Sequence, residues 1–454
     1  MKRSILVISC AIGIFVAGCK KTNNPDPNPA PPPPTPVPTA VDKMKDTVLL
    51  YSREIYLWYK NIPDTFNPRT YADPDAIMTA IRKYSNEPGF SKPVDRYSFG
   101  ILQSDWNNIS NGISGDFGIG VFFLAQGDLR VSFVEKESPA GKAGVTRSWR
   151  ITSLNGSTNI TTSNASAIVD AVYYSSSTTF GFKRPDNTDT TITLASAAYQ
   201  EHPVFVDTVY NVGGNNVGYM VLNSFIGDTA SIKSEFARVF NRFSTSNVQD
   251  VIIDLRYNGG GYVSLAEELD DYLVPSSGNG DVLLTYAYND KYTSNNITDT
   301  YGKKGSLNLS RVFFIGTQNT ASASELVINS LKPYLNVQLV GPTNTYGKPV
   351  GFFPIPVGNW YIFPISFRTI NKSGVGNYFE GLTPNYQVMD GLDKQWGDVN
   401  ENCLASVLHF IGNGTYARAI APRLQEGLSR EIQDVNVKMG TKFFKGSIGR
   451  NRIQ

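Results

Sequence analysis

The strongest constraint on the fold is the alternation of apolar strand-like runs with helical stripes between residues 217 and 340. Residues 251–255 form an apolar run bounded by polar turns, as in a buried strand, whereas apolar residues in 232–243 recur at helical spacing. This alternation predicts an α/β sheet, largely parallel, with helices across its faces. The expected strands are residues 217–222, 251–255, 282–288, 312–315 and 337–340, and the expected helices are residues 232–243, 264–273 and 322–331.

Three segments with unusual polar or glycine content follow strands of this alternation. They are residues 256–261, which contain three consecutive glycines, residues 319–325, and residues 346–348. In open sheets of this kind the reactive crevice lies beyond the carboxyl ends of the strands. We therefore expect the three segments to lie near one another.

Ser322 stands between two alanines where a helix is expected to begin. Small neighbours leave room for a substrate, and the free N–H groups of a helix start can stabilise a developing anion. Ser322 and Glu325 also form a capping-box pattern ahead of an apolar run, which needs no catalysis to explain it. The glycines at 259–261 are equally compatible with a tight turn or an anion-binding turn, and they lack the spacing of a nucleotide-binding GxxxxGK[ST] loop.

The scarcity of histidine limits the choice of a base for Ser322. The chain has only His202 and His409, neither at a predicted strand end, and two histidines exclude a multi-histidine metal site. A lysine can replace histidine if burial lowers its pKa from about 10.4 towards roughly 7–8. Lys348 follows a strand and has apolar neighbours, although an ordinary surface lysine is the simpler interpretation of any single lysine.

The charge balance gives no reason to expect a nucleic-acid partner. The 41 Lys and Arg residues against 39 Asp and Glu give a formal charge of +2, and two of the basic residues are Lys2 and Arg3 in a predicted leader. No global basic field therefore remains. The length of 454 residues predicts two to four domains, at about 100–200 residues each.

The first eighteen residues have the three parts of an export signal: basic Lys2 and Arg3, an apolar run over 5–16, and small residues before Cys19. Residues 16–19 resemble a bacterial lipobox, which implies lipidation of Cys19; an ordinary signal peptide is the alternative. Cys10 would leave with the signal and Cys403 would stand alone, so we expect no intramolecular disulfide. Nine prolines between residues 25 and 38 predict an extended tether.

Residues 42–96 have helical periodicity, with expected helices from residue 42 and over residues 75–84, to which we assign packing roles only. Residues 97–200 change to short β-runs and glycine turns, and the order of 118–123, 129–134, 138–145 and 151–156 resembles a PDZ domain. That resemblance implies a groove that adds peptide tails as a strand. The loop that would hold the terminal carboxylate is formed by Phe117, Gly118, Ile119 and Gly120. Family members carry Pro-Gly-Asp where this chain has residues 147–150 (Arg-Ser-Trp-Arg), and an unrelated small β-domain is the alternative.

Residues 254–261, 320–325, 346–348 and 381–385 together resemble the motifs of the carboxyl-terminal processing (tail-specific) serine peptidases, and the likeness covers about residues 45–410. The resemblance implies a Ser-Lys dyad with Ser322 as nucleophile and Lys348 as general base. It also implies oxyanion donors from the backbone amides of Gly260 and Ala323, and an assisting carboxylate at Glu325. Phe352 stands where the family usually has a glutamine, which removes a supporting hydrogen-bond partner.

The expected protein is multidomain α+β, with a small N-terminal helical region, a PDZ-like β-rich domain and an α/β catalytic domain with a largely parallel sheet. We expect a serine endopeptidase that cleaves proteins or peptides through an acyl-enzyme, needs no metal or organic cofactor, and is anchored by lipid at Cys19 in a bacterial cell envelope. The alternative is a weakly active or inactive lipoprotein that binds peptides on the same scaffold. The expected divisions are a signal peptide (1–18), a tether (19–41), a helical region (42–96), a PDZ-like domain (97–200), a catalytic domain (201–412) and an extension (413–454) with a helix over 417–432.

Overall fold

The computed structural model describes residues 37–416, 426–440 and 444–451, and the part from Ala40 onward forms one compact unit. The predicted signal peptide, the predicted lipidation site Cys19 and almost all of the predicted tether lie outside the described residues. No helix among the residues described is both long and apolar enough to cross a bilayer.

A six-stranded sheet forms the centre of the larger region, in the order β21-β16-β15-β11-β10-β9. Every neighbouring pair is parallel except β9 with β10, which confirms the expected largely parallel sheet. The strands are β9 (Val204–Val212), β10 (Asn215–Leu222), β11 (Val248–Asp254), β15 (Arg311–Ile315), β16 (Asn336–Gly341) and β21 (Tyr386–Gln387).

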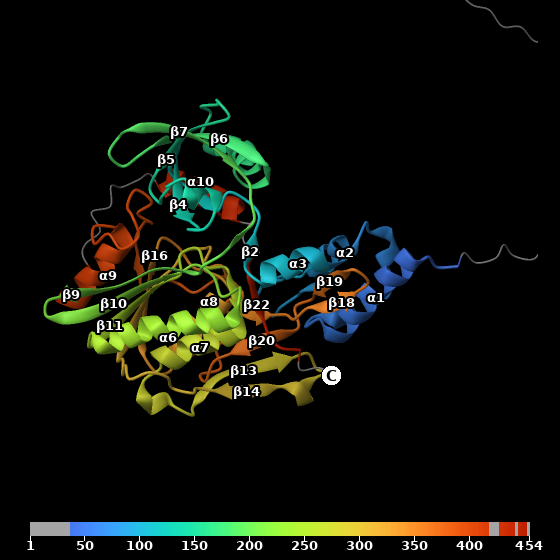
Figure 1. The fold of residues 1–454 in the computed structure, drawn as a ribbon. Helices are drawn as coiled ribbons and strands as arrows, with labels where there is room; N and C mark the ends of the chain where they lie inside the picture. Colours follow the sequence, from blue (N-terminus) through green and yellow to red (C-terminus); the bar gives the residue numbers. More distant parts are fainter. Residues whose placement is uncertain (1–36, 417–425, 441–443, 452–454) are drawn as a thin grey trace, which may run out of the picture. The chain divides into compact units, whose positions relative to one another are not determined.

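Helices cover both faces of this sheet, because successive side chains of a buried strand point to opposite sides. Ile253 and Phe314 pack with α6 (Thr229–Thr245), α7 (Val263–Leu273) and α8 (Ala323–Leu331) on one face. Ile252 and Phe313 pack with α9 (Asn402–Asn413) on the other face. Figure 1 shows α6 and α7 side by side, with α9 across β9 and β10 from α6.

One strand of the predicted alternation belongs to a different sheet. β13 (Val282–Tyr288) lies in an antiparallel sheet of order β14-β13-β20-β17. Its side chains alternate in burial along much of the strand, which fits a sheet with one wetter face rather than the interior of a parallel sheet. The other strands are β14 (Ile297–Thr300), β17 (Val350–Gly351) and β20 (Phe367–Ile370).

The N-terminal region contains the two expected helices, α1 (Ala40–Ile55) and α2 (Pro74–Ile81). The Asp73 side chain caps α2 by accepting a hydrogen bond from Ala76 N, and Pro74 occupies the first helical position. β1 (Phe99–Leu102) then pairs with β19 (Trp360–Phe363), which pairs with β18 (Ile355–Val357). The short helix α3 (Gln103–Ser110) follows β1.

A second β-region has a hydrophobic core of its own. It is an antiparallel sheet of order β3-β4-β5-β6-β7, so β3 is an edge strand. Its elements are β3 (Ile119–Ala125), β4 (Asp128–Val134), α4 (Pro139–Lys142), β5 (Arg150–Leu154), α5 (Ala165–Val169), β6 (Ser177–Lys183) and β7 (Asp189–Ala195). Nearby, β2 (Ile113–Ser114) pairs with β8 (Tyr199–Gln200).

The extension beyond residue 413 contains two described elements. Helix α10 (Glu426–Met439) continues seven residues past the predicted end at 432, and residues 417–425 of the prediction lie outside the described residues. Strand β22 (Gly446–Ile448) pairs with β12 (Gly260–Tyr262), which begins at the second of the three consecutive glycines. Figure 1 shows α10 against the β3–β7 sheet and β22 beside α8.

Candidate active site

The structure brings together the three segments that follow β11, β15 and β16. Ala321 N donates a hydrogen bond of 3.0 Å to Asn258 O, which joins the second segment to the glycine turn. Tyr346 N donates one of 2.9 Å to Thr320 O, which joins the third segment to the second. Parallel pairing of the three strands puts their carboxyl ends at one edge, as expected for a reactive crevice.

Ser322 precedes the first residue of α8 and has φ 61° and ψ −110°. A positive φ is unusual for a residue with a Cβ and costs of order 1–3 kcal/mol, so the surrounding structure must hold it. The side chain is only 1% exposed. Its hydroxyl donates a hydrogen bond of 2.7 Å to Ser447 Oγ, from β22.

Glu325 links the serine turn to the lysine loop. Its carboxylate accepts hydrogen bonds from Ser322 N (2.8 Å) and Lys348 N (2.8 Å). It also accepts hydrogen bonds from Gly347 N (2.7 Å) and the Thr345 hydroxyl. Burial raises the pKa of Glu325, and these hydrogen bonds oppose the rise. One residue therefore caps the start of α8 and also fixes the main chain at Lys348, and an assisting role of Glu325 in catalysis stays a prediction.

The Lys348 amine is enclosed, with the side chain 1% exposed. Nζ lies 3.8 Å from the centroid of the Phe352 ring and 5.0 Å from that of Tyr97, and it donates a hydrogen bond of 3.0 Å to Lys445 O. Burial lowers its pKa well below the usual value, while nearby Asp95 opposes this effect. These surroundings favour the uncharged amine, which is the form that can accept a proton.

Ser322 and Lys348 do not hydrogen bond to each other among the described residues. Each bonds instead to the segment around β22, through Ser447 and Lys445. The two side chains are therefore bonded to residues 445 and 447 of the C-terminal extension and not to each other. The sequence of that segment predicts no role for it.

The two predicted oxyanion donors are neighbours. A Cβ placed on Gly260 would lie 3.0 Å from Ala323 N, so the two main chains approach closely, and Gly260 has φ 104°. Ala323 is the first residue of α8, where N–H groups have no acceptor within the helix. Gly260 N donates a hydrogen bond of 2.9 Å to the Asn258 side chain in this structure.

The N-terminal region also contacts the lysine loop. The Tyr97 hydroxyl donates a hydrogen bond to Gly347 O, and Arg96 Nη2 donates one of 2.9 Å to Tyr346 O. We had assigned the helices of this region packing roles only, and no sequence periodicity connects residues 96–97 with a loop about 250 positions later. Phe352, the departure from the family motif, faces the Lys348 amine with its ring in place of an amide.

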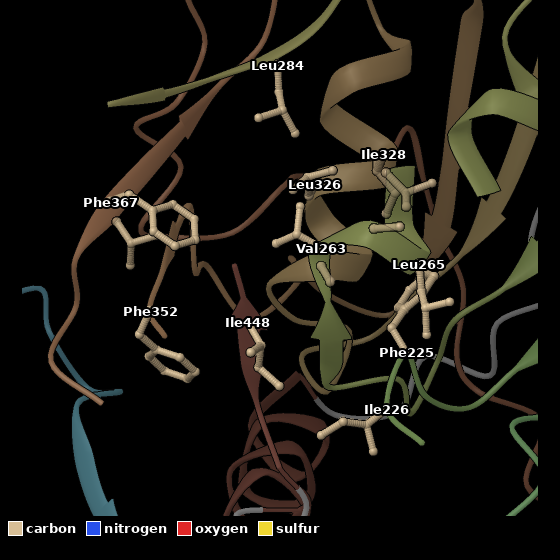
Figure 2. Close-up of a cluster of buried hydrophobic side chains, with 14 of the residues drawn as sticks. Phe225, Ile226, Val263, Leu265, Leu284, Leu326, Ile328, Phe352, Phe367 and Ile448 are labelled. Carbon is tan, nitrogen blue, oxygen red and sulfur yellow. The ribbon is translucent and has the colours of Figure 1, made fainter. Parts of the chain in front are cut away.

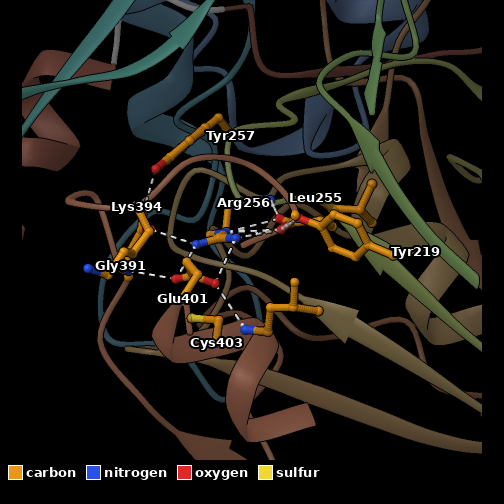
Figure 3. Close-up of polar contacts among 12 residues, drawn as sticks. Tyr219, Leu255, Arg256, Tyr257, Gly391, Lys394, Glu401 and Cys403 are labelled. Atoms are coloured by element: carbon orange, nitrogen blue, oxygen red, sulfur yellow. Dashed lines mark hydrogen bonds and ion pairs between the residues drawn. The ribbon is translucent and has the colours of Figure 1, made fainter. Parts of the chain in front are cut away.

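A buried ion network supports the turn after β11 (Figure 3). Arg256 is 1% exposed and contacts Asp254 at 2.6 Å, Asp390 at 2.7 Å and Glu401 at 2.8 Å. Arg147 reaches the same Asp390 carboxylate at 2.9 Å from the turn that departs from the PDZ pattern. The network fixes the residues immediately before Asn258 and the glycine turn.

The predicted peptide loop leads into β3. Phe117 is 1% exposed, Gly118 N donates a hydrogen bond to Asp116, and Ile119 and Gly120 pair with β4. Gly118 has φ 74°, and a Cβ there would lie 2.0 Å from Ser138 Cβ, so only glycine fits. A cavity of about 440 Å³ extends from Gly118 and Ile119 to Gly259 at the glycine turn. The described residues contain no group of three or more His, Cys, Asp and Glu residues that could hold a metal ion.

The chain is similar in sequence and fold to known proteases. Over 320 residues (67% of this chain), the sequence is 25% identical to the carboxy-terminal processing protease CtpB of Bacillus subtilis. Over 265 residues (56%), it is 23% identical to a CtpA-like serine protease of Staphylococcus saprophyticus. The matches span 60% and 50% of the lengths of these relatives. A crystal structure from Bacteroides fragilis assigned to the S41 proteases has a TM-score of 0.67 at 25% identity, covering 81% of this chain and 97% of its own.

Two parts of the chain match the same family directly. Residues 216–388 match Peptidase family S41, and these residues contain the predicted serine, lysine and glycine-turn segments. Residues 44–99 match the Peptidase S41 N-terminal domain and include the residues that contact the lysine loop. Through both domains the chain belongs to peptidase family S41.

Proposed function

We propose that the protein is a serine endopeptidase of the carboxyl-terminal processing type, with Ser322 as nucleophile and Lys348 as general base. The observation that carries this proposal is the Glu325 carboxylate, which accepts hydrogen bonds from the main-chain amides of both Ser322 and Lys348. One carboxylate thereby holds the main chain of a strained serine turn and the main chain of a buried lysine, which suits a nucleophile and its base.

The uncharged Lys348 amine takes the proton of the Ser322 hydroxyl as Oγ attacks the carbonyl carbon of a peptide bond. The Ala323 amide, together with the Gly260 amide once it is released from the Asn258 side chain, stabilises the negative charge that develops on the carbonyl oxygen. The resulting lysine ammonium returns its proton to the leaving amine, so that the peptide C–N bond breaks and an acyl-enzyme remains. Water then attacks the ester with Lys348 again as base, which releases the acid and restores Ser322.

The test uses Ser322→Ala and Lys348→Ala in the full chain, with an unstructured peptide mixture and a serine-reactive fluorophosphonate probe. Both variants should lose peptide cleavage, and Ser322→Ala should lose labelling. Ser324→Ala is a matched control, because Ser324 lies two residues away with its hydroxyl directed to Asn258 O at 3.0 Å. Cleavage by both site variants at the wild-type rate would refute the assignment.

A non-catalytic peptide-binding protein is the second candidate. The observation in its favour is Phe352, which puts an aromatic ring at 3.8 Å from the Lys348 amine and offers no side-chain hydrogen bond to it. In that case an accessible Ser322 would not be labelled by the probe, while peptides would still bind. The predicted PDZ-like loop at residues 117–120 would then be the main peptide site.

We further propose that the chain is exported and anchored through lipid at Cys19, in a bacterial cell envelope. The support is the leader pattern of residues 1–19 followed by the proline-rich stretch. In cells fed an alkyne fatty acid, the wild-type chain should incorporate the label and Cys19→Ser should not. Equal incorporation in both would refute the anchor site.

A further inference from the structure

Residues 444–449, which contain the strand β22, lie between the glycine turn and Phe352. β22 pairs in parallel with β12, in the register Gly260 with Gly446 and Tyr262 with Ile448, and Gly446 N donates a hydrogen bond of 3.0 Å to Gly259 O. On the other side, Phe352 N donates to Ser447 O at 3.0 Å, and Gly449 N donates to Phe352 O at 2.9 Å. The segment is thus held by main-chain hydrogen bonds on both of its edges.

The same strand satisfies the polar groups of the site. Ser447 accepts the hydrogen bond of the Ser322 hydroxyl, and Lys445 O accepts that of the Lys348 amine. A peptide substrate would offer main-chain and side-chain groups of the same kinds at this place. Nucleophile and base are therefore both engaged with a peptide segment of the chain itself.

Side chains of the strand fill the site closely. Ile448 is 6% exposed and packs in the cluster that includes Val263 and Phe352, as Figure 2 shows. The Phe444 ring lies 5.7 Å from the ring of Trp106. Gly446 fits because it has no side chain: a Cβ there would lie 2.7 Å from the Phe352 ring and 2.3 Å from that of Phe444.

Helix α10, earlier in the same extension, covers a second strand edge. Asn436 Oδ1 accepts a hydrogen bond of 2.8 Å from Phe123 N, and its Nδ2 donates one of 2.8 Å to Phe123 O. Phe123 lies in β3, the edge strand next to the predicted peptide loop. An edge strand with free N–H and C=O groups is where an added peptide strand would pair.

We propose that residues 444–449 occupy in cis the place where the main chain of a substrate binds, so that the protein is latent until this segment leaves. The site then takes an extended peptide strand, parallel to β12, with a small residue where Gly446 now packs against Phe352. That the occupied place is a substrate site rests on the proposed function. That residues 444–449 occupy it rests on the pairing of β22 with β12.

The physical argument is competition for one strand edge. β12 can pair with one strand on the side that β22 occupies, and a tethered segment acts at an effective concentration of the order of mM. A substrate in trans therefore binds only the fraction of molecules in which the segment is displaced, and its apparent affinity falls by that fraction.

The test measures access to position 322 without requiring catalysis. Ser322→Cys is placed in three full-length backgrounds: the natural segment, the displaced segment Gly446→Val/Ile448→Asp, and the control Arg450→Ala. Arg450 is exposed beyond the strand, whereas Gly446 and Ile448 are buried. The rate of iodoacetamide modification is read by mass spectrometry on the peptide that carries position 322.

Displacement should increase the modification rate by about tenfold or more, and Arg450→Ala should leave it unchanged. Equal rates in the displaced and control backgrounds would overturn the proposal. If the double variant does not fold, Gly446→Val alone carries the same comparison, because its clash is with side-chain rings. In chains that keep Ser322, displacement should also raise peptide cleavage; a rise in thiol access without cleavage would refute the proposed peptidase function and leave the cis occupancy standing.

Discussion

The burial of the Lys348 amine comes at the expense of stability. Its amine is buried against Phe352 and Tyr97, and it donates a single hydrogen bond to a carbonyl oxygen. Water would solvate a lysine ammonium strongly, so the folded chain favours the uncharged form and the unfolded chain the charged one. The same burial that favours the uncharged amine therefore weakens folding at neutral pH.

Lys348→Met should make this penalty visible through pH. The folded pKa of Lys348 is lowered, so folding releases a proton between that pKa and the unfolded value of about 10.4, and wild-type stability from this group rises with pH in that window. The penalty is full below the folded pKa and vanishes above about 10.4. Relative to wild type, the Met variant should therefore lose stability as pH rises, by up to about 1.4 kcal/mol per pH unit.

Urea unfolding of both chains between pH 7 and pH 10 measures this difference. Lys83→Met is the control because Lys83 is exposed, and its curve should run parallel to that of the wild type. A difference between Lys348→Met and wild type that stays constant with pH would show that the amine is not buried in the folded protein.

Among single residues near Ser322 and Lys348, those that follow strands could be predicted from the sequence. Those that distant segments bring to the same place could not. Ser322 and Lys348 could be selected because each follows a predicted strand, and parallel strands align their carboxyl ends. Tyr97 and Ser447 contact the same site from positions more than 100 residues away from Ser322. Nothing in local periodicity encodes such long-range contacts, since they depend on how the N-terminal region and the extension pack.

The turn after β11 is an element whose geometry depends on buried charge. Arg256→Met would leave the carboxylates of Asp254 and Glu401 buried beside Asp390 without their shared partner. We expect a loss of about 3–5 kcal/mol in the free energy of unfolding, as for other buried pairs that lose one member. Arg256→Lys should be intermediate, because an ammonium keeps the charge but not the planar set of donors.

Denaturant unfolding distinguishes this from a surface effect. Arg238→Ala removes an exposed arginine of α6 that pairs with Asp207 and Glu235, and it should cost less than about 1 kcal/mol. An Arg256→Met chain within 1 kcal/mol of this control would mean that the network is not needed to hold the turn.

The Asn436 side chain of α10 protects the main chain at the edge strand β3. Asn436→Ala removes both side-chain hydrogen bonds to Phe123, so the amide of Phe123 should exchange with solvent faster, by about tenfold. Asp434→Ala on the exposed side of the same helix is the matched control. Hydrogen exchange read by mass spectrometry over β3 measures the effect; no change in Asn436→Ala would mean that the edge is protected by something other than this amide.

Helices and strands can be predicted where a long segment repeats its apolar residues at a regular spacing. Short apolar runs are misassigned because their sheet depends on tertiary contacts. The stripe from Ile232 to Phe243 gave α6 because five apolar residues at helical spacing leave little choice. The sequence predicts β13 among the parallel strands because a short apolar run looks the same in either kind of sheet, and its antiparallel partners β14 and β20 show the difference. β22 was not predicted, since a strand of three residues with one apolar side chain carries no periodic signal.

At the scale of the whole molecule, Arg147 connects the β3–β7 sheet to the peptidase core. Its guanidinium donates hydrogen bonds to Ser132 O at 2.6 Å and to the Tyr257 hydroxyl at 2.8 Å, and it lies 4.1 Å from the centroid of the Trp396 ring. The residue stands in the turn that departs from the PDZ pattern. That departure therefore has a structural use, because the turn contacts Tyr257 two residues before the glycine turn.

Arg147→Met should loosen this connection while the core stays folded, since the Asp390 carboxylate keeps its contacts with Arg256 and the Tyr257 hydroxyl. We expect hydrogen exchange to accelerate over residues 389–397 and over β4, with α6 unchanged, and global stability to fall by roughly 1–3 kcal/mol, the usual cost of leaving buried polar groups unsatisfied. The Tyr257 hydroxyl would lose its hydrogen bond from Arg147 and keep the one to Asp390. We therefore also expect faster hydrogen exchange at Gly259–Gly261, two residues further along the chain. Acceleration spread evenly over the chain, α6 included, would instead indicate general destabilisation and would contradict a role for Arg147 in joining the two sheets.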